Sequence, residues 1–222
     1  MGHCKIRTQQ MTANTKKNFA QAMKILEERG VLLVSGREIP DVQRLVTRQP
    51  IKGSWWGDPS GPEIFAVSEM LADHPDVTMT KLISGKVTFV HRQLWQKLVV
   101  VGNEREEWQT RKLTASAKLL LRQLDKNGSL LSHNLGSSFG KKPTDAVREL
   151  ELKLLLHSEQ FHTETGFHSK LLETWEHWAK RMGLRIKATE ASRARKFLEK
   201  RLEEINEAYS GFGCLPWQPK RK

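Results

Sequence analysis

The chain has 222 residues, with 37 Lys and Arg against 25 Asp and Glu, so its formal net charge is +12 at pH 7. This excess is larger than solubility alone requires and favours a polyanionic partner: nucleic acid, an anionic membrane or an acidic protein. Hydrophobic residues make up 38% of the chain, which excludes a disordered protein. The two cysteines, Cys4 and Cys214, lie near opposite ends, which argues against a disulfide-stapled fold and predicts a cytoplasmic protein with reduced thiols.

The sequence contains no membrane-spanning segment and lacks three common motifs, for a catalytic serine, a phosphate-binding loop and a zinc site. No apolar run approaches the roughly 18 residues that a membrane-spanning helix needs, and no signal-peptide core follows Met1. The motifs G-x-S-x-G, G-x-x-x-x-G-K-[ST] and H-E-x-x-H are absent. We therefore expect no membrane partner and no cofactor, and the sequence leaves open whether the protein is an enzyme.

The amino-terminal half predicts helices around one hairpin. Apolar residues at helical spacing predict a helix over 12–29 that ends at Gly30, and a short strand follows. Glycines and prolines predict a loop over 53–62, and a helix follows it. Two β-rich runs around Ser84-Gly85 predict a hairpin. A helix is expected over 94–108.

The middle of the chain predicts three helices followed by a hairpin. An amphipathic helix starts at Thr114, a second short helix is expected over 130–135, and a third starts at Pro143. Beyond it, residues 154–175 either form a hairpin or continue the third helix. The Thr and Gly residues within 162–166 are poor helix formers and favour the hairpin.

This order of elements over residues 113–180 resembles the winged-helix arrangement of DNA-binding domains. The resemblance implies that the third helix enters the major groove while the hairpin, or wing, touches the backbone. Glu149 and Glu151 depart from it, because they bring negative charge onto the third helix. The residues that the resemblance assigns to nucleic-acid binding are Lys141, Lys142, Thr144 and Arg148 on the third helix and its approach, with Lys170 on the wing.

These patterns predict a mainly α fold with small β-hairpins (α+β), in which a winged-helix-like central unit packs against helical flanks. The expected domains are a helical amino-terminal region with one hairpin over 1–103, the winged-helix-like unit over 104–188, and a basic carboxy-terminal helix and tail over 189–222.

A second candidate binding group is the run Lys52-Gly-Ser-Trp55-Trp56. Adjacent tryptophans in a loop can stack unpaired bases while a lysine contacts phosphate. The alternative is that at least one indole fills the core, because Trp is largely buried on average.

Three residues around the predicted hairpin turn could bind a metal. A turn at 164–166 would place His162 and His168 opposite each other, with Glu164 beside them. Imidazole and carboxylate suit zinc or iron, although the spacing matches no established motif. Scattered polar histidines are the alternative, and no bound metal is expected.

The function that these observations favour is nucleic-acid binding, to DNA rather than RNA. The first alternative is a nucleic-acid-processing enzyme that acts on bases or strands. The second is a protein–protein adaptor whose basic helix over 189–208 docks an acidic partner.

Overall fold

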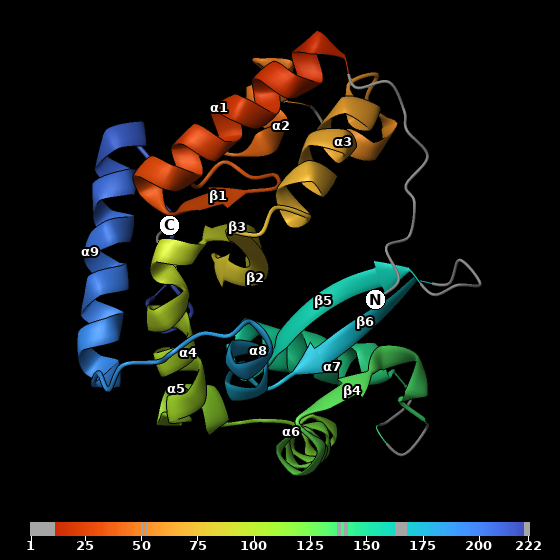
Figure 1. Cartoon of the computed structure of the whole chain (residues 1–222), viewed down its shortest axis with the longest axis vertical. Coiled ribbons are helices and arrows are strands. Elements are labelled where there is room, and N and C mark those ends of the chain that lie inside the picture. The colour runs from red at the N-terminus through yellow and green to blue at the C-terminus, as the bar shows by residue number, and fades with distance from the viewer. Residues whose placement is uncertain are drawn as a thin grey trace. The chain divides into compact units, whose positions relative to one another are not determined.

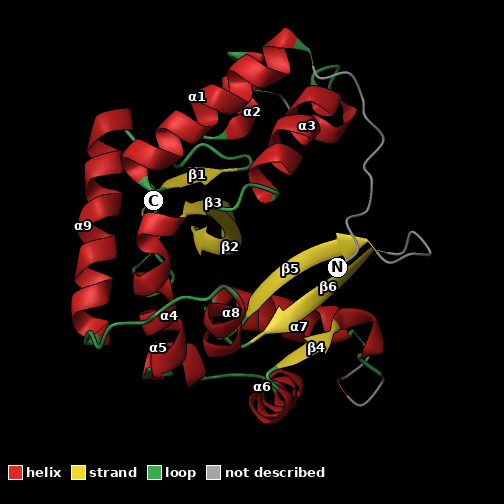
Figure 2. Ribbon diagram, viewed as in Figure 1, coloured by secondary structure: helices red, strands yellow, loops and turns green. Residues whose placement is uncertain are grey.

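The computed structural model describes residues 12–49, 51, 53–136, 139, 142–162 and 168–219 (Figure 1). Helices dominate these residues, together with two small three-stranded antiparallel sheets, so the predicted fold class is confirmed (Figure 2). The chain forms two compact units: residues up to Trp95 together with those from Leu198 onward, and Gln96–Phe197. The sequence predicted three continuous domains, whereas the first of these two units combines two separate stretches of the chain. The predicted domain boundaries stay a prediction. None of the helices among the described residues is both long and apolar enough to cross a bilayer.

The first unit places helices around the sheet β1-β3-β2. Its first helix begins where Thr12 Oγ1 accepts a hydrogen bond from the Thr15 amide, and ends at Gly30, which has φ +88°. Its buried core brings together residues of the helices and the sheet, including Leu26, Ile64 and Phe89. The elements are α1 (Ala13–Arg29), β1 (Val31–Leu33), α2 (Val42–Thr47), the 3-10 helix η1 (Trp55–Gly57), α3 (Gly61–Ala72), β2 (Val77–Ile83) and β3 (Lys86–His91), followed by the 3-10 helix η2 (Arg92–Leu94).

The predicted hairpin around Ser84-Gly85 is confirmed as β2 and β3. Both turn residues have positive φ, 54° and 71°, the backbone geometry of a type I′ turn. The twist of a type I′ turn matches that of the two flanking strands. This match explains why the dipeptide Ser84-Gly85 between two β-rich runs predicted the hairpin correctly.

The second unit begins with helices that differ from the prediction. The expected helix over 94–108 is broken into α4 (Trp95–Glu104) and α5 (Glu107–Thr110). Arg105 has φ +56°, which a helix cannot accommodate, and Glu106 and Gln109 form a capping box that starts α5 afresh. The basic carboxy-terminal helix is α9 (Ala191–Tyr209), whose residues from Leu198 onward belong to the first unit.

The centre of the second unit is built on the sheet β4-β6-β5. The predicted short helix over 130–135 is partly wrong, because its first residues extend as a strand that pairs with β6. The hairpin beyond the third helix is confirmed, although its turn, 163–167, lies outside the described residues. The elements are α6 (Ala115–Asn127), β4 (Ser129–Leu131), the 3-10 helix η3 (Ser132–Asn134), α7 (Pro143–Leu152), β5 (His157–His162), β6 (His168–Glu173) and α8 (Trp175–Arg181).

The two units repeat one order of elements. Each has a helix, a short strand, a helical turn, a second main helix and a hairpin, and in each the short strand pairs with the last strand of the hairpin. No internal repeat is evident in the amino-acid sequence itself. The repeat is not visible in the sequence because the two units share only the order of their helices and strands. No common sequence motif marks the corresponding positions.

Gly102 tests the packing of the second unit. Alanine normally stabilises a helix relative to glycine by about 1 kcal/mol. A Cβ at Gly102 in α4, however, would overlap the indole ring of Trp175, which is 1% exposed and cannot move freely. We therefore expect Gly102→Ala to lower the midpoint of thermal unfolding, with an overpacking cost of about 1–3 kcal/mol.

The matched control is Gly57→Ala, because a Cβ at Gly57 would meet no atom within 4 Å. Circular dichroism melts of both variants decide the point. A Gly102→Ala melting temperature equal to or above that of the wild type would contradict the packing described.

Candidate nucleic-acid interface

Helix α7 has one buried and one exposed face. Ala146, Val147 and Leu150 enter the core of the second unit, while Thr144, Asp145 and Arg148 are exposed. Pro143 occupies the first turn, where its missing N–H costs nothing. The helix therefore presents a polar face with Arg148 one turn after Thr144.

The start of α7 combines a cation with the positive end of a helix. Lys142 is exposed at the N-cap position, and its side chain has no acceptor with which to cap the first-turn amides. Backbone N–H groups at such a terminus attract anions. Asp145, in the same turn, opposes this attraction. Lys141, predicted to belong to this group, lies outside the described residues.

The two acids that seemed to conflict with DNA binding are engaged within the fold. Glu149 accepts hydrogen bonds from the Thr114 amide at 3.0 Å and from Thr114 Oγ1 at 2.7 Å, which ties α7 to the start of α6. Glu151 is 4% exposed and accepts from Ser158 Oγ at 2.6 Å and Lys170 Nζ at 2.8 Å. Neither carboxylate belongs to the exposed face formed by Thr144 and Arg148.

Lys170 has a structural partner that the sequence did not reveal. Its ammonium group bridges from β6 to Glu151 at the end of α7, and the Lys170 side chain is 39% exposed. The ion pair fixes the hairpin against α7, so the charge of Lys170 is shared with Glu151.

A buried ion pair anchors the base of the hairpin. The Glu173 side chain is 0% exposed, and Arg181 of α8 donates to its two oxygens from Nε at 3.0 and 3.1 Å and from Nη2 at 2.7 Å. Arg181 Nη2 also reaches Glu159 of β5. One guanidinium thus links both strands to α8, and it compensates a charge that would be costly to bury alone.

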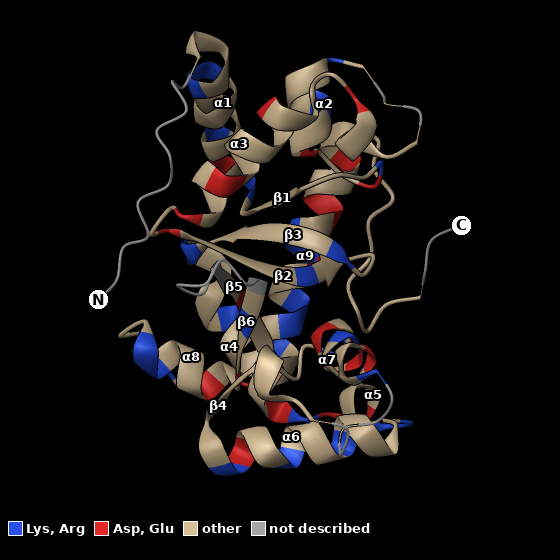
Figure 3. Ribbon diagram, turned by 90° about the vertical axis from the view of Figure 1, so that its right-hand side faces the viewer, with Lys and Arg blue, Asp and Glu red and all other residues tan. Residues whose placement is uncertain are grey.

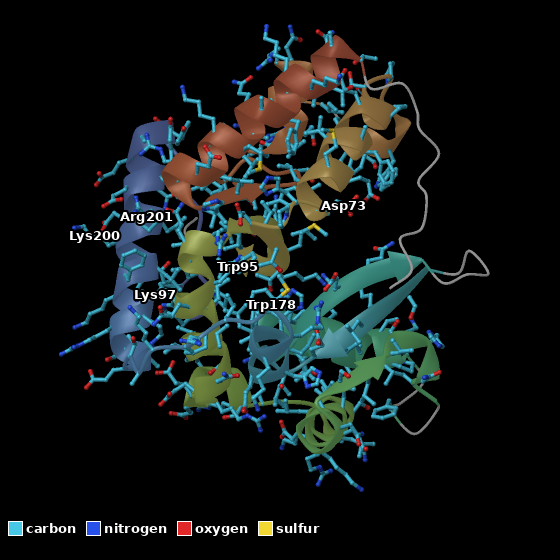
Figure 4. All side chains as sticks on the ribbon, viewed as in Figure 1. Asp73, Trp95, Lys97, Trp178, Lys200 and Arg201 are labelled. Atoms are coloured by element: carbon cyan, nitrogen blue, oxygen red, sulfur yellow. The ribbon has the colours of Figure 1, made fainter. Side chains whose placement is uncertain are left out.

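His157 completes this buried group. Its ring lies 4.9 Å from that of Trp178 and 5.3 Å from that of Trp175, and Trp178 projects from α8 (Figure 4). Burial, assisted by the positive charge of Arg181, lowers the pKa of His157 from 6.5 to about 3. The imidazole is therefore neutral at physiological pH and does not act there as a proton donor.

The structure places a possible metal group away from the predicted one. His162 and His168 pair across the hairpin as expected, but Glu164 and the side chains of both histidines lie outside the described residues. Among the described residues, ligand atoms of His157, Glu159 and Glu173 lie within 4.8 Å of one another. Arg181 already pairs with both carboxylates, so a metal ion would have to displace it, and we interpret the group as structural.

The tryptophan pair lies in the first unit. Trp55 is half-buried against the core, whereas Trp56 is 68% exposed. Their rings are stacked, with centroids 4.2 Å apart and planes 22° apart. One indole therefore packs against the core, as the alternative expected, and the other faces solvent, whereas base stacking by this pair stays a prediction. Lys52 lies outside the described residues.

The stretch 96–197 has an excess of cations, whereas several cations of α9 are paired with acids of the same chain. Residues 96–197 contain 19 Lys and Arg against 12 Asp and Glu. Figure 3 colours the cations blue and the acids red on the described residues. On the predicted docking helix α9, by contrast, Arg193 pairs with Glu190, Arg195 with Glu106, and Arg201 with Glu204. These internal pairs reduce the positive charge that α9 can offer to an acidic partner. Figure 4 labels Lys200 and Arg201, two of the cations on α9.

Sequence reasoning missed the residues that hold the site together. Glu151, Glu173 and Arg181 gave no motif, because their partners come from other elements. One usable signal was a carboxylate at the end of an apolar strand, as in Leu171-Leu-Glu173, where a buried acid needs a cationic partner.

The model of the family described as AlkZ related matches residues 16–211. Comparisons with curated proteins and with solved structures give no significant match.

The buried His157 predicts acid sensitivity. The unfolded chain takes up a proton near pH 6.5, but the folded chain takes it up only near pH 3. Stability from neutral His157 is therefore fully present above pH 6.5 and is lost as the pH falls toward 3, by about 2 kcal/mol at pH 5. We expect His157→Phe to flatten this decline, measured by urea unfolding at pH 7.5 and 5.0.

Replacement of the exposed Phe212 by Leu is the control, because it removes no titratable group and should leave the decline as in the wild type. If His157→Phe lost as much stability between the two pH values as the wild type does, the lowered pKa would be refuted.

Proposed function

The chain belongs to the AlkZ-related family, and we propose that it binds duplex DNA through the exposed face of α7 and the β5–β6 hairpin. AlkZ is a DNA repair glycosylase-like protein, and the family name points to a DNA-associated function. Membership alone assigns no residue, so the position of the interface must come from the geometry.

The arrangement of the second unit supports a winged-helix assignment. Its helices α6 and α7 enclose a core with the sheet β4-β6-β5, and η3 lies between β4 and α7. In a winged helix, the last helix before the hairpin is the one that enters the major groove. That helix is α7, and the hairpin would be the wing that contacts the backbone.

The observation that carries the proposal is the exposed polar face of α7. Lys142 and Arg148 are exposed there, and Glu149 and Glu151 are turned into hydrogen bonds within the fold. Phosphate contacts from Lys142, Thr144 and the first-turn amides would position the helix. Arg148, one turn further along, could then reach either phosphate or a guanine edge. On the sequence alone, Lys141 joins this surface.

Lys170 is assigned a positioning role and not a DNA contact. It holds the hairpin against α7 through Glu151, and its half-exposed side chain lies on the strand that leads from the wing. We assign it chiefly to positioning of the wing.

A base-processing enzyme is the second candidate, and the family name favours it. The described residues offer one carboxyl with a raised pKa: burial raises that of Asp41 to about 6, beside an open cleft of about 450 Å³. However, the Asp41 side chain is 0% exposed, and Oδ1 caps α2 by accepting from the Arg44 amide. Asp41 is therefore a structural cap in this conformation. Release of free base from alkylated duplex DNA is the assay for this candidate.

The proposed interface predicts a specific change in salt dependence. The double variant Lys142→Ala/Arg148→Ala should weaken binding to a labelled 20-bp duplex. It should also reduce the slope of log K against log[salt] by up to about 2, because two phosphate contacts release fewer counterions. Fluorescence anisotropy across a salt series measures both quantities.

The control is Lys16→Ala/Lys17→Ala, which removes the same charge from exposed positions on α1. An unchanged slope in the α7 variant, or an equal change in the control, would refute this position for the interface.

A further inference from the structure

Three aromatic side chains of the first unit form an exposed platform, defined here as Trp55, Trp56 and Phe65. Trp56 stacks on Trp55, and its ring centroid lies 5.8 Å from that of Phe65, with planes 46° apart. Trp56 is 68% exposed and Phe65 is 44% exposed, whereas Trp55 packs against the core. The platform thus has a fixed base and an outer surface that faces water.

The backbone beneath the platform is tightly organised. The Asp58 amide donates to the Trp55 carbonyl at 3.2 Å, and the Gly61 amide donates to the Asp58 carbonyl at 2.8 Å. A Cβ on Gly61 would lie 2.8 Å from the Trp55 carbonyl oxygen, so glycine lets α3 begin directly against η1. Trp56 is therefore presented on a compact turn, and binding would require little ordering of this segment.

The acids beside the platform are occupied. Asp58 Oδ1 accepts from the Ser60 amide at 2.9 Å, and Glu63 Oε1 accepts from Asn18 Nδ2 at 2.9 Å. Each of these carboxylates thus accepts a hydrogen bond from within the first unit. The ligand surface is consequently the aromatic face itself, which offers stacking and not ion pairing.

The size of the platform limits what can occupy it. A large aromatic side chain buries about 150–250 Å², so the exposed parts of Trp56 and Phe65 amount to a few hundred Å² at most. A stable protein–protein interface needs about 800 Å² per partner. A second copy of the chain or a folded partner would need far more apolar surface than this, whereas one or two flat heterocycles would be covered fully.

We propose that the Trp55–Trp56–Phe65 platform binds an unpaired nucleobase of DNA by stacking on Trp56. This inference rests on the proposed DNA binding and adds a substrate class: DNA with a base outside the duplex stack. Every base has a π-face, so the platform would act without sequence preference. It would also contribute little to the salt slope, because stacking releases no counterions.

Anisotropy with the full chain tests the inference on four probes of related sequence: a paired duplex, the same duplex with one bulged thymine, the single DNA strand, and that strand as RNA. Trp56→Ala should weaken binding to the bulged and single-stranded DNA about tenfold, the typical effect of losing one base stack. Its affinity for the paired duplex and its salt slope should equal those of the wild type. Trp56→Phe should restore part of the loss.

The matched control is Phe212→Ala, because Phe212 is 43% exposed and Phe65 is 44% exposed. Phe65→Ala should lower affinity for the bulged probe, whereas Phe212→Ala should not. Circular dichroism verifies folding of each variant, and loss of the exciton couplet confirms that Trp56→Ala removes the stacked pair.

The outcomes separate this inference from the proposed function. If the wild type binds DNA and Trp56→Ala loses nothing on the bulged probe, or loses equally on the paired duplex, the platform inference is overturned and duplex binding stands. A loss confined to the RNA strand would overturn the choice of DNA. If the wild type binds none of the probes, both proposals fall.

Discussion

The ion pair between Glu173 and Arg181 is the constraint on which the proposed interface depends. Glu173 ends β6 with a fully buried side chain, and Arg181 compensates its charge while reaching Glu159 on β5. Arg181 therefore fixes both strands of the hairpin to α8 at the base of the hairpin. Removal of the guanidinium would leave a buried carboxylate unpaired, which typically costs about 3–5 kcal/mol. Glu151 then sets the position of α7 against this fixed hairpin through Ser158 and Lys170.

This arrangement separates charges that hold the fold from charges that can bind a ligand. In the second unit, the carboxylates of Glu149, Glu151 and Glu173 are used internally. Lys142 and Arg148 remain on the exposed face of α7. Asp145 is the exposed acid beside them, so this face carries two cations and one carboxylate. The aromatic platform of the first unit would add stacking, which depends on unpaired bases and not on charge.

The hairpins were predictable because local chemistry determines them. Ser84-Gly85 suits a turn with two positive φ angles. The second hairpin was favoured over a longer helix because Thr and Gly are poor helix formers, and in the structure α7 ends earlier, at Leu152, before Leu154 with φ +50°. The break at Arg105 was not predictable, because an arginine with positive φ leaves no pattern in the sequence. Leu130-Leu131 fits a helix or a strand equally well, and only pairing with β6 selects the strand. The candidate surface followed the same division: exposed cations could be named in advance, but the partners of Glu149, Glu151 and Lys170 depend on contacts between elements distant in sequence.

Amide hydrogen exchange of the full chain with and without a duplex tests whether α7 and the hairpin contact DNA. We expect bound DNA to slow exchange at the start of α7 and in the described parts of β5 and β6, while α1 exchanges as in the free protein. Protection confined to α9 or α1, with none at α7, would contradict it.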